Sequence, residues 1–340
     1  MRRLSYLTAA AVMLSASTCL AAGELHIYNW GDYASPPMIE KFSKEYDVKV
    51  TVDAYDSNET MLSKVRAGGS GYDVAMPSDY TVKIMVDEGM LERIEPASMQ
   101  NFKNLRPDMI NVYWDEGRHY SVPWMHGLTS FAVDTAIYKG DIDTYAILFD
   151  PPKELQGRIN MLDDMNSVMH AAERYLGFPR CTADKTQLKQ INDLLNKAKP
   201  HWRTFSYDGQ TLLTSGDVDA SMMWNGNAYR ARLERPTMKF AYPKEGIEGF
   251  MDNVVVLKDA PNLENAKLFV NFMMDPQNAG INSDYNKYDN GVVGSDKFMP
   301  ADFAGAPEIK RPDGVVAEYV KPCPAEVVEI YNKIWTNLRK

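Results

Sequence analysis

Aromatic and acidic residues recur just beyond the predicted strands of this chain. A pocket with aromatic walls attracts an alkyl ammonium through cation–π contacts, and a carboxylate in it adds a charge-assisted hydrogen bond. Ligands of open parallel sheets bind outside the carboxyl ends of the strands, so these residues are candidates for one amine-binding pocket. They form five groups: Trp30, Asp32 and Tyr33; Ser78, Asp79 and Tyr80; Asp163 and Asp164; Trp224, Asn225 and Asn227; Phe250 and Asp252.

Each of these residues also has a purely structural explanation. A Trp or Tyr after a strand often packs in the core. An Asp in that position, Asp164 above all, often caps the helix that follows. The recurrence of five groups favours the pocket. A hydrolase with a carboxylate pair, drawn from Asp32, Asp164 and Asp252, is the alternative from another class of protein.

The pocket requires alternating strands and helices, and the N-terminal part of the sequence shows this alternation. Short runs rich in β-branched and aromatic residues predict strands at 24–29, 48–55 and 72–76. Pro36 and Pro37 open an amphipathic helix, Ser57 is a candidate N-cap of a second helix, and a third is expected over about 78–88. This order predicts a parallel, doubly wound sheet.

A second α/β unit follows along the chain. Its predicted strands are 158–162, 218–224 and 253–257, and its predicted helices are 166–176, 185–198, 262–274 and one from 325. Because no long Gly/Ser linker separates the units, the chain is expected to cross between two lobes on short segments near 130–134 and 250–254. The predicted division places 23–131 and 252–297 in lobe 1, and 132–251 and 298–340 in lobe 2.

Composition excludes several classes of protein. The chain has 340 residues with 37 Lys and Arg against 46 Asp and Glu, a formal net charge of −9, which argues against nucleic acid as a partner. Its 45% hydrophobic and 24% charged residues exclude a disordered chain and a multi-span membrane protein. The length favours two globular lobes.

The first 22 residues have the features of a secretory signal peptide. Arg2 and Arg3 precede a short apolar stretch, and two alanines come before Gly23. Cys19 is expected to leave with this peptide. Export to an oxidising compartment makes Cys181 and Cys323 a candidate disulfide, with two unpaired, buried thiols as the alternative.

The sequence shows no motif for catalysis or metal binding. The histidines lack the spacing of a helical zinc motif, and no Ser or Cys sits in a nucleophile motif. We therefore expect no enzyme activity, no cofactor and no bound metal. The five histidines are His26, His119, His126, His170 and His201.

A series of motifs resembles the periplasmic spermidine/putrescine-binding proteins of ABC transporters. The resemblance implies a two-lobed α/β fold of the type II-like periplasmic binding proteins, which close on a small ligand like a trap. It also implies a periplasmic monomer whose partner is a membrane permease. The motifs are YNWGDY at 28–33, DSNET at 56–60, YDV at 72–74, PS at 77–78, NL at 104–105, PD at 107–108, YSVP at 120–123, WNG at 224–226, PKEG at 243–246 and FMD at 250–252.

The resemblance also assigns roles to individual positions. The family's aromatic box falls on Trp30, Trp224, Phe250 and Tyr288, with Tyr33 and Tyr80 nearby. The family's amine-binding acids fall on Asp32, Asp164 and Asp252. Ser78 matches a serine that contacts ligand.

Four positions depart from the family pattern in charge. Ser167 stands where polyamine binders carry Glu, and Asn227 where some carry Asp. Arg230 replaces an uncharged residue, and Lys321 replaces a Gln. Compared with the family pattern, the pocket therefore loses negative charge and gains positive charge. This change favours a ligand with an ammonium at one end, bound by Asp252, and a carboxylate at the other, bound by the planar guanidinium of Arg230.

These charges predict γ-aminobutyrate as the ligand, and the chain is similar to the subgroup of the family that binds it. Arg203 is a second candidate for the carboxylate, unless it caps the 185–198 helix. Arg230 could instead be a surface residue paired with Glu234. A polyamine (putrescine or spermidine) and a conjugate of an amino acid with a sugar are the alternative ligands.

Overall fold

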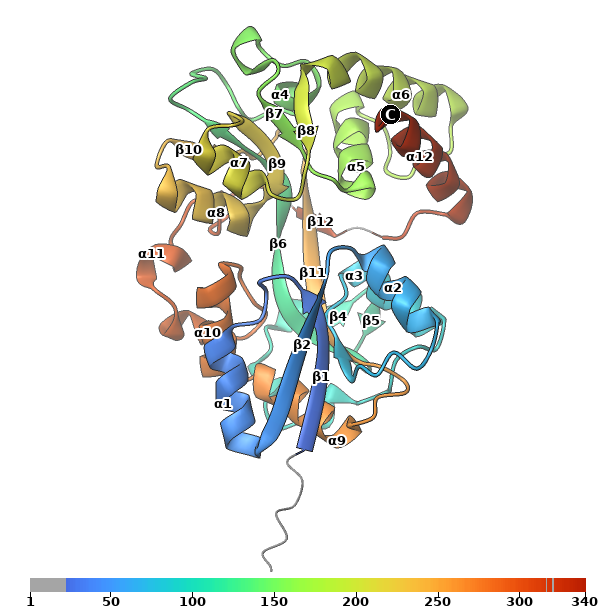
Figure 1. Cartoon of the computed structure of the whole chain (residues 1–340), viewed down its shortest axis with the longest axis vertical. Helices are drawn as coiled ribbons and strands as arrows, with labels where there is room; N and C mark the ends of the chain where they lie inside the picture. The colour runs from blue at the N-terminus through green and yellow to red at the C-terminus, as the bar shows by residue number, and fades with distance from the viewer. Residues whose placement is uncertain (1–22, 316, 320) are drawn as a thin grey trace, which may run out of the picture.

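The computed structural model describes residues 23–315, 317–319 and 321–340, so the predicted signal peptide lies outside the described residues. We call the lower half of Figure 1 lobe 1 and the upper half lobe 2. In lobe 1, β1 (Gly23–Trp30) pairs in parallel with β2 (Val48–Tyr55) and β3 (Val74–Ala75). The helices of this lobe are α1 (Pro36–Tyr46), α2 (Asn58–Arg66), α3 (Asp79–Asp87), α9 (Leu263–Met273) and α10 (Pro276–Asn286).

Lobe 2 repeats the α/β arrangement. β7 (Ile159–Met161) pairs in parallel with β8 (Trp202–Phe205) and β9 (Ala220–Trp224). The helix α6 (Lys185–Ala198) has the bounds that the sequence predicts, whereas β8 and α7 (Gly209–Ser215) have no counterpart among the predicted elements. The helices of lobe 2 are α4 (Ala146–Phe149), α5 (Met165–Leu176), α6 (Lys185–Ala198), α7 (Gly209–Ser215), α8 (Asn225–Glu234) and α12 (Ala325–Leu338).

Two long antiparallel strands, β6 (Ser121–Asp134) and β11 (Ile247–Val256), run from one lobe into the other (Figure 1). In lobe 2, β6 pairs with β9 and β10 (Met238–Phe240), and in lobe 1, β11 pairs with β3. The sheet is therefore continuous and mixed, in the order β2-β1-β3-β11-β6-β9-β7-β8, with β10 paired to β6 and β12 (Ala317–Tyr319) paired to β11. The crossing segments predicted near 130–134 and 250–254 lie inside these two strands.

The chain passes between the lobes once more near its end. After α10 it continues through α11 (Ala301–Ala304) to β12 (Ala317–Tyr319), which pairs in parallel with β11, and then to α12 on lobe 2. A short hairpin of β4 (Asn111–Val112) and β5 (Asp115–Glu116) completes lobe 1. The division of the chain at 131/132, 251/252 and 297/298 stays a prediction.

Each lobe has its own hydrophobic core. In lobe 1, Phe42, Trp124 and Phe269 lie in one buried cluster around α1, α9 and the sheet. In lobe 2, Phe149 and Tyr331 belong to a separate cluster that joins α5, α6 and α12. The two-lobed α/β fold predicted from the sequence is confirmed. No helix among the described residues is both long and apolar enough to cross a bilayer.

Cys181 and Cys323 form a disulfide, as predicted. The bond joins the turn between α5 and α6 to the segment just before α12, across 142 positions of the sequence. It thereby fastens the last helix to lobe 2. A cross-link over so long a loop removes much conformational freedom from the unfolded chain.

Removing this cross-link is expected to destabilise the protein. The double variant C181S/C323S should lose about 2–4 kcal/mol of the free energy of unfolding, measured by urea denaturation followed by circular dichroism. Wild-type protein unfolded with a reductant present is the control and should show a similar loss. Equal denaturation midpoints for the variant and the oxidised wild type would contradict the expectation.

Candidate functional site

The carboxyl group of Asp252 lies between the two lobes, on β11. It is buried, with 5% of the residue exposed. It accepts a hydrogen bond from Ser78 Oγ at 2.7 Å and another from the Tyr33 hydroxyl at 2.9 Å. The pairing of β11 with β6 shifts register between Asp252 and Asn253, at the place where the chain presents this side chain.

Burial makes the ionised form of Asp252 costly. It raises the pKa of this carboxyl to about 7, although the hydrogen bonds from Ser78 and Tyr33 act in the opposite direction. Both donors are hydroxyls and neither carries a positive charge. A buried carboxyl with this environment gains most from a cation that can enter the site.

Ser78 and Tyr80 are held in place by Asn58, in the first turn of α2. The Asn58 side chain donates to Ser78 Oγ at 3.1 Å and to the Tyr80 hydroxyl at 3.0 Å, and it accepts from the Ser78 backbone N–H at 3.1 Å. Ser78 occupies the N-cap position of α3, yet its hydroxyl makes no capping hydrogen bond and donates to Asp252 instead. The Ser78 hydroxyl therefore supports the Asp252 carboxyl instead of the helix terminus.

Aromatic rings surround Asp252 on the side of lobe 1. The Tyr288 ring meets Tyr33 edge-to-face at 5.5 Å between centroids, and it meets Phe250 at 5.8 Å. Trp30 packs on Tyr55 at 4.6 Å and donates its ring N–H to the Met76 carbonyl at 2.9 Å. Trp30 and Phe250 are only partly buried, so part of each ring is free to contact a ligand.

A second acidic group lies where α2 of lobe 1 approaches lobe 2. Asp164 caps α5, because its carboxylate accepts the Ser167 backbone N–H at 2.7 Å. Its pKa is nevertheless raised, mainly by burial. The Tyr80 hydroxyl donates to Glu59 at 3.4 Å. Glu59 is an exposed residue of α2, yet partial desolvation and, after it, the Asp164 charge raise the pKa of its carboxyl. The capping role expected as an alternative for Asp164 is therefore present, and it leaves the carboxylate close to Glu59.

Two aromatic side chains of lobe 2 complete the wall near this acidic group. Trp224, at the end of β9, stacks on Tyr207 at 6.0 Å with the ring planes 17° apart. Burial raises the pKa of Tyr207, and the Asp164 and Glu59 charges raise it further. Stacked rings beside carboxylates are suited to an alkyl chain that ends in an ammonium group.

Arg230 on α8 reaches across to lobe 1. Its Nη2 donates to the backbone carbonyl of Asn286 at the end of α10. Its Nε is buried and has no hydrogen-bond partner among the described residues. The positive charge acts to lower the pKa of Tyr288, against the larger effect of burial. The alternative pairing with Glu234 is not seen in the described residues, and Glu234 accepts from Gln210 at 3.4 Å.

The lobes also touch at Tyr288. Its hydroxyl donates to the Asn227 side-chain oxygen of α8. A Cβ added to Gly226 would lie 2.5 Å from the Tyr288 ring, so only glycine fits at this contact. Asn227, Arg230 and Tyr288 thus come together, and Asn227 contacts a ring of the wall rather than an acid.

Four residues singled out in the sequence lie apart from these groups or act differently. Asp32 is exposed and has a left-handed backbone, with φ of 52°. Arg203 is exposed on β8 and lies 3.8 Å from Asp217. Lys321 lies over the ring of Tyr113 at 5.6 Å. Ser167 contributes the backbone N–H that Asp164 binds.

The sequence analysis missed three residues of the site. Asn58 and Glu59 lie inside the motif at 56–60. The sequence analysis explained this segment by the capping of a helix at Ser57, so it gave no role in the site to the two residues that follow. Ser57 does cap α2, accepting the Thr60 backbone N–H at 3.1 Å. Tyr207 follows β8, a strand that was not predicted, so the rule about strand ends could not be applied to it.

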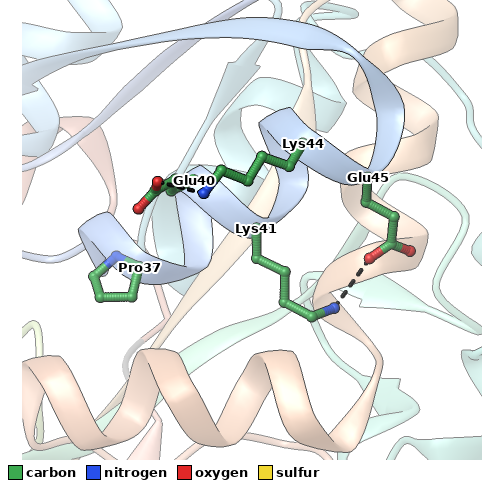
Figure 2. A pocket seen from close by; sticks show the side chains of 5 residues that line it. All are labelled: Pro37, Glu40, Lys41, Lys44 and Glu45. Atoms are coloured by element: carbon green, nitrogen blue, oxygen red, sulfur yellow. Dashed lines mark hydrogen bonds and ion pairs between the residues drawn. The ribbon is translucent and has the colours of Figure 1, made fainter.

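The outer surface offers a hollow on α1, but it has no features of a binding site. Figure 2 shows its lining, where Lys41 pairs with Glu45 at 3.0 Å and Lys44 with Glu40 at 2.7 Å. These pairs join successive turns of one exposed helix and satisfy one another's charge. We take the residues around Asp252 and Asp164, not this hollow, as the candidate site.

Comparison with known proteins places this geometry in a family. Residues 37–288 match the family described as bacterial extracellular solute-binding protein. The putrescine-binding periplasmic protein of Pseudomonas aeruginosa (strain UCBPP-PA14) is 30% identical over 336 residues, covering 93% of this chain and 91% of the relative. The spermidine/putrescine-binding periplasmic protein of Escherichia coli (strain K12) is 34% identical over 271 residues, covering 79% and 77%.

Solved structures agree with the fold. A putative spermidine/putrescine ABC transporter protein from Listeria monocytogenes superimposes with a TM-score of 0.87 at 28% identity, over 93% of this chain and 99% of the other. A protein described as a GABA receptor shares the fold with a TM-score of 0.71 at 18% identity, over 93% and 97%. From the family match and the relatives at 30–34% identity, we conclude that the chain belongs to the bacterial extracellular solute-binding proteins, among the periplasmic spermidine/putrescine-binding proteins.

Proposed function

We propose that this protein is the periplasmic binding component of an ABC importer and that it captures a polyamine, with a diamine such as putrescine as the best fit. The observation that carries the proposal is the buried carboxyl of Asp252, whose two hydrogen-bond donors are uncharged hydroxyls. One ammonium of the ligand would bind there. The other would reach Asp164 and Glu59, where two carboxyl groups have raised pKa values.

The balance of charge supports a dication. The residues assigned to the site include three carboxyl groups, those of Asp252, Asp164 and Glu59, and one guanidinium, that of Arg230. Part of that guanidinium is already bound to the Asn286 carbonyl. Each carboxylate gains a charge-assisted hydrogen bond from an ammonium, while the partly exposed rings of Trp30 and Trp224 contact the methylenes between.

Binding would draw the lobes together, because the partners of the ligand are divided between them. Ser78, Tyr33 and Glu59 belong to lobe 1, and Asp164 and Trp224 belong to lobe 2. The separate cores allow each lobe to move as a body about β6 and β11, and a ligand that touches both favours the closed arrangement. A membrane permease would recognise the loaded form, and export would depend on the predicted signal peptide.

A zwitterion such as γ-aminobutyrate is the second candidate, and one observation favours it. Arg230 Nε is buried without a partner among the described residues, so one guanidinium N–H is free to bind a ligand carboxylate. Against this, a carboxylate in the same pocket would also approach Asp164 and Glu59. Like charges at close range in a desolvated site oppose binding.

Titration calorimetry with single ligands distinguishes the two candidates. Putrescine should bind, and γ-aminobutyrate should bind at least ~100-fold more weakly, because juxtaposed like charges cost several kcal/mol. R230A should leave putrescine affinity within a few-fold of wild type. Tight binding of γ-aminobutyrate that R230A abolishes, with no heat from putrescine, would replace the first candidate by the second.

Asp252→Asn tests the central contact. The substitution keeps the shape of the side chain but leaves one ammonium unpaired in a buried site, so putrescine affinity should fall by about 3 kcal/mol or more. Asp217→Asn is the matched control, since Asp217 is exposed on lobe 2. The Asp217→Asn variant should bind putrescine as tightly as the wild type. Both variants should show the same thermal unfolding midpoint to within a few degrees. Undiminished putrescine binding by Asp252→Asn would refute the assignment.

The pH dependence of binding follows from the raised pKa of Asp252. A bound ammonium favours the ionised carboxylate, so ligand must displace a proton below about pH 7. Putrescine affinity should therefore fall by roughly tenfold between pH 8 and pH 6, a range in which alkyl ammonium groups stay charged. Calorimetry in buffers of different ionisation enthalpy measures the released proton. An Asp252→Asn protein with the wild-type pH profile would show that another group is responsible.

The raised pKa of Asp252 also affects the stability of the unliganded protein. This stability changes with pH in the direction opposite to that of ligand affinity. The folded chain holds a proton on Asp252 at a pH where the unfolded chain has released it. The contribution of this group to stability is therefore lost as pH rises through about 7. The increase in melting temperature caused by putrescine should accordingly be larger at pH 8 than at pH 6.

A further inference from the structure

A buried arginine lies in lobe 1 beside the strand that carries Asp252. Arg118, in the turn between β5 and β6, is 0% exposed. The hydrogen bonds that the structure shows for its guanidinium all go to neutral acceptors. Burial lowers its pKa to about 10, although the charge of Asp115 acts in the opposite direction. Because a buried charge is costly unless its polar groups are satisfied, the folded protein has to maintain these contacts.

Two of the contacts go to the residues on either side of Asp252. Arg118 Nη1 donates to Asn253 Oδ1 at 2.7 Å, and Nη2 lies 3.3 Å from the sulfur of Met251. The Asn253 side-chain amide donates to the Met251 carbonyl at 2.8 Å, across the intervening Asp252. The ring N–H of Trp114 donates to the same Asn253 oxygen at 3.2 Å. The guanidinium thus contacts β11 on both sides of the carboxyl.

Strand pairing by itself does not fix the direction of the Asp252 side chain. The register between β11 and β6 shifts between Asp252 and Asn253. A slip of one residue turns a side chain to the other face of a sheet, so contacts of the neighbouring side chains have to select one arrangement. In the arrangement seen here, the Asn253 backbone N–H donates to the Pro77 carbonyl at 2.9 Å, which keeps Ser78 beside Asp252.

Arg118 is itself held firmly in its turn. Its Nε donates to the Met109 carbonyl at 2.7 Å, and Nη1 donates to Ser121 Oγ at 3.0 Å. Ser121 Oγ donates in turn to the buried carboxylate of Asp115 at 2.8 Å. The Arg118 backbone is left-handed, with φ of 55°, a conformation that persists in a residue with a side chain only where the surroundings impose it. The guanidinium therefore has a fixed place against which β11 packs.

We propose that Arg118 is a positioning residue, which fixes the direction of the Asp252 carboxyl and thereby sets the affinity of the site for an ammonium group. It acts through Asn253 and Met251 and does not contact the ligand itself. A lysine would keep the charge, but its single ammonium group does not reproduce the planar fork that contacts both neighbours. The proposal rests on the proposed function only in taking Asp252 as the carboxyl that binds the ligand.

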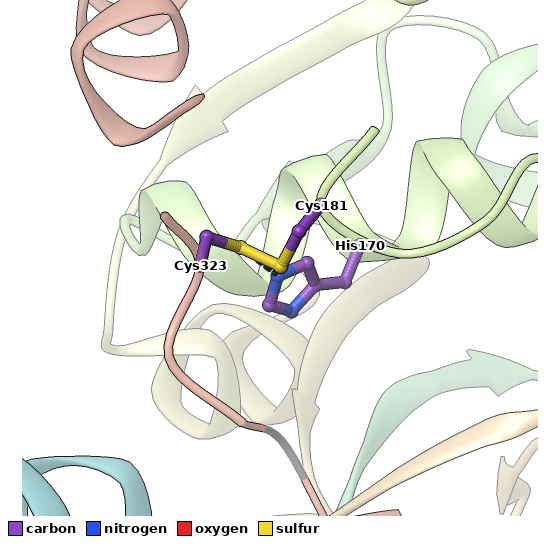
Figure 3. Close-up of side chains that lie close together, drawn as sticks. All are labelled: His170, Cys181 and Cys323. Carbon is purple, nitrogen blue, oxygen red and sulfur yellow. Dashed lines mark hydrogen bonds between the residues drawn. A yellow bond between two sulfur atoms is a disulfide. The ribbon is translucent and has the colours of Figure 1, made fainter. Parts of the chain in front are cut away.

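The same strand has another buried polar contact, on the side of lobe 2. The carboxylate of Glu248 lies 2.9 Å from Nδ1 of His170 on α5 and so orients the imidazole. His170 is 2% exposed, and its Nε2 lies 3.9 Å from the disulfide sulfur of Cys323 (Figure 3). This contact holds β11 without involving the neighbours of Asp252. His170→Gln is therefore a matched control for a general loosening of the strand.

The pKa of Asp252 in the unliganded protein reports the position of its carboxyl. Carbon-13 NMR of labelled aspartate carboxyls follows the titration, and the signal that is missing from Asp252→Asn identifies the group. The hydrogen bonds from Ser78 and Tyr33 hold this pKa down against burial. R118K, which frees the carboxyl to turn away from them, should raise the pKa by about one pH unit, because a hydrogen bond to a charged group is weakened. N253A should raise it similarly, and H170Q should leave it unchanged.

Putrescine binding and a combined variant complete the test. Putrescine affinity should fall by at least ~10-fold in R118K and in N253A, and by no more than a few-fold in H170Q. The double variant R118K/N253A should raise the Asp252 pKa no further than the larger single effect, because both substitutions break one contact.

Three outcomes would overturn the proposal. They are a wild-type Asp252 pKa in folded R118K and N253A, an equal shift in H170Q, and shifts that add in the double variant. If R118K does not fold, N253A and H170Q decide the question by the same titration. A wild type that binds no putrescine would refute the proposed function alone, because the titration needs no ligand.

Discussion

The ionised form of Asp252 has to be stabilised in a place from which water is largely excluded, and the arrangement of the site follows from this constraint. The two hydroxyls that donate to it, from Ser78 and Tyr33, supply hydrogen bonds without charge. Burial therefore keeps the pKa of this carboxyl near 7, and a bound cation would lower it. Asn58 holds the hydroxyl of Ser78, and the Tyr288 ring packs on Tyr33, so the donors are fixed before any ligand arrives. Such preorganisation reduces the cost of ordering the site on binding.

The position of that carboxyl on a crossing strand connects ligand binding to the movement of the lobes. β6 and β11 belong to both halves of the sheet, and Asp252 sits where their register shifts. The contacts of Arg230 with Asn286 and of Tyr288 with Asn227 show that the lobes already meet beside the pocket. A ligand that bridges Asp252 and Asp164 would add attraction between bodies whose cores are separate, which is the physical basis of closure by a hinge.

The sequence favours γ-aminobutyrate as the ligand, whereas the structure favours a polyamine. The difference arises because the groups around a charged side chain determine whether it is available to bind a ligand. In the sequence, Arg230 and the neutral Ser167 suggest that the pocket has lost acids and gained a base. In the structure, one N–H of Arg230 is bound to a backbone carbonyl, and Glu59 supplies a carboxyl near Asp164 from another helix. The acid that the family resemblance leads one to expect at Ser167 would then be replaced, in our proposal, by Glu59 of lobe 1. This favours a dication over a zwitterion.

The sequence by itself determined the alternation of strands and helices, the two lobes, the disulfide partners and most side chains around Asp252. These depend on local periodicity, on capping residues and on the rule that strand ends gather in a parallel sheet. Only the tertiary structure decided that Asp32 and Arg203 stay in solvent, that Asn58, Glu59 and Tyr207 join the site, and that Glu248 orients His170. The reason is physical, because contacts between residues distant in sequence depend on how the helices pack and on which strands cross between the lobes. The type of a residue determines neither of these.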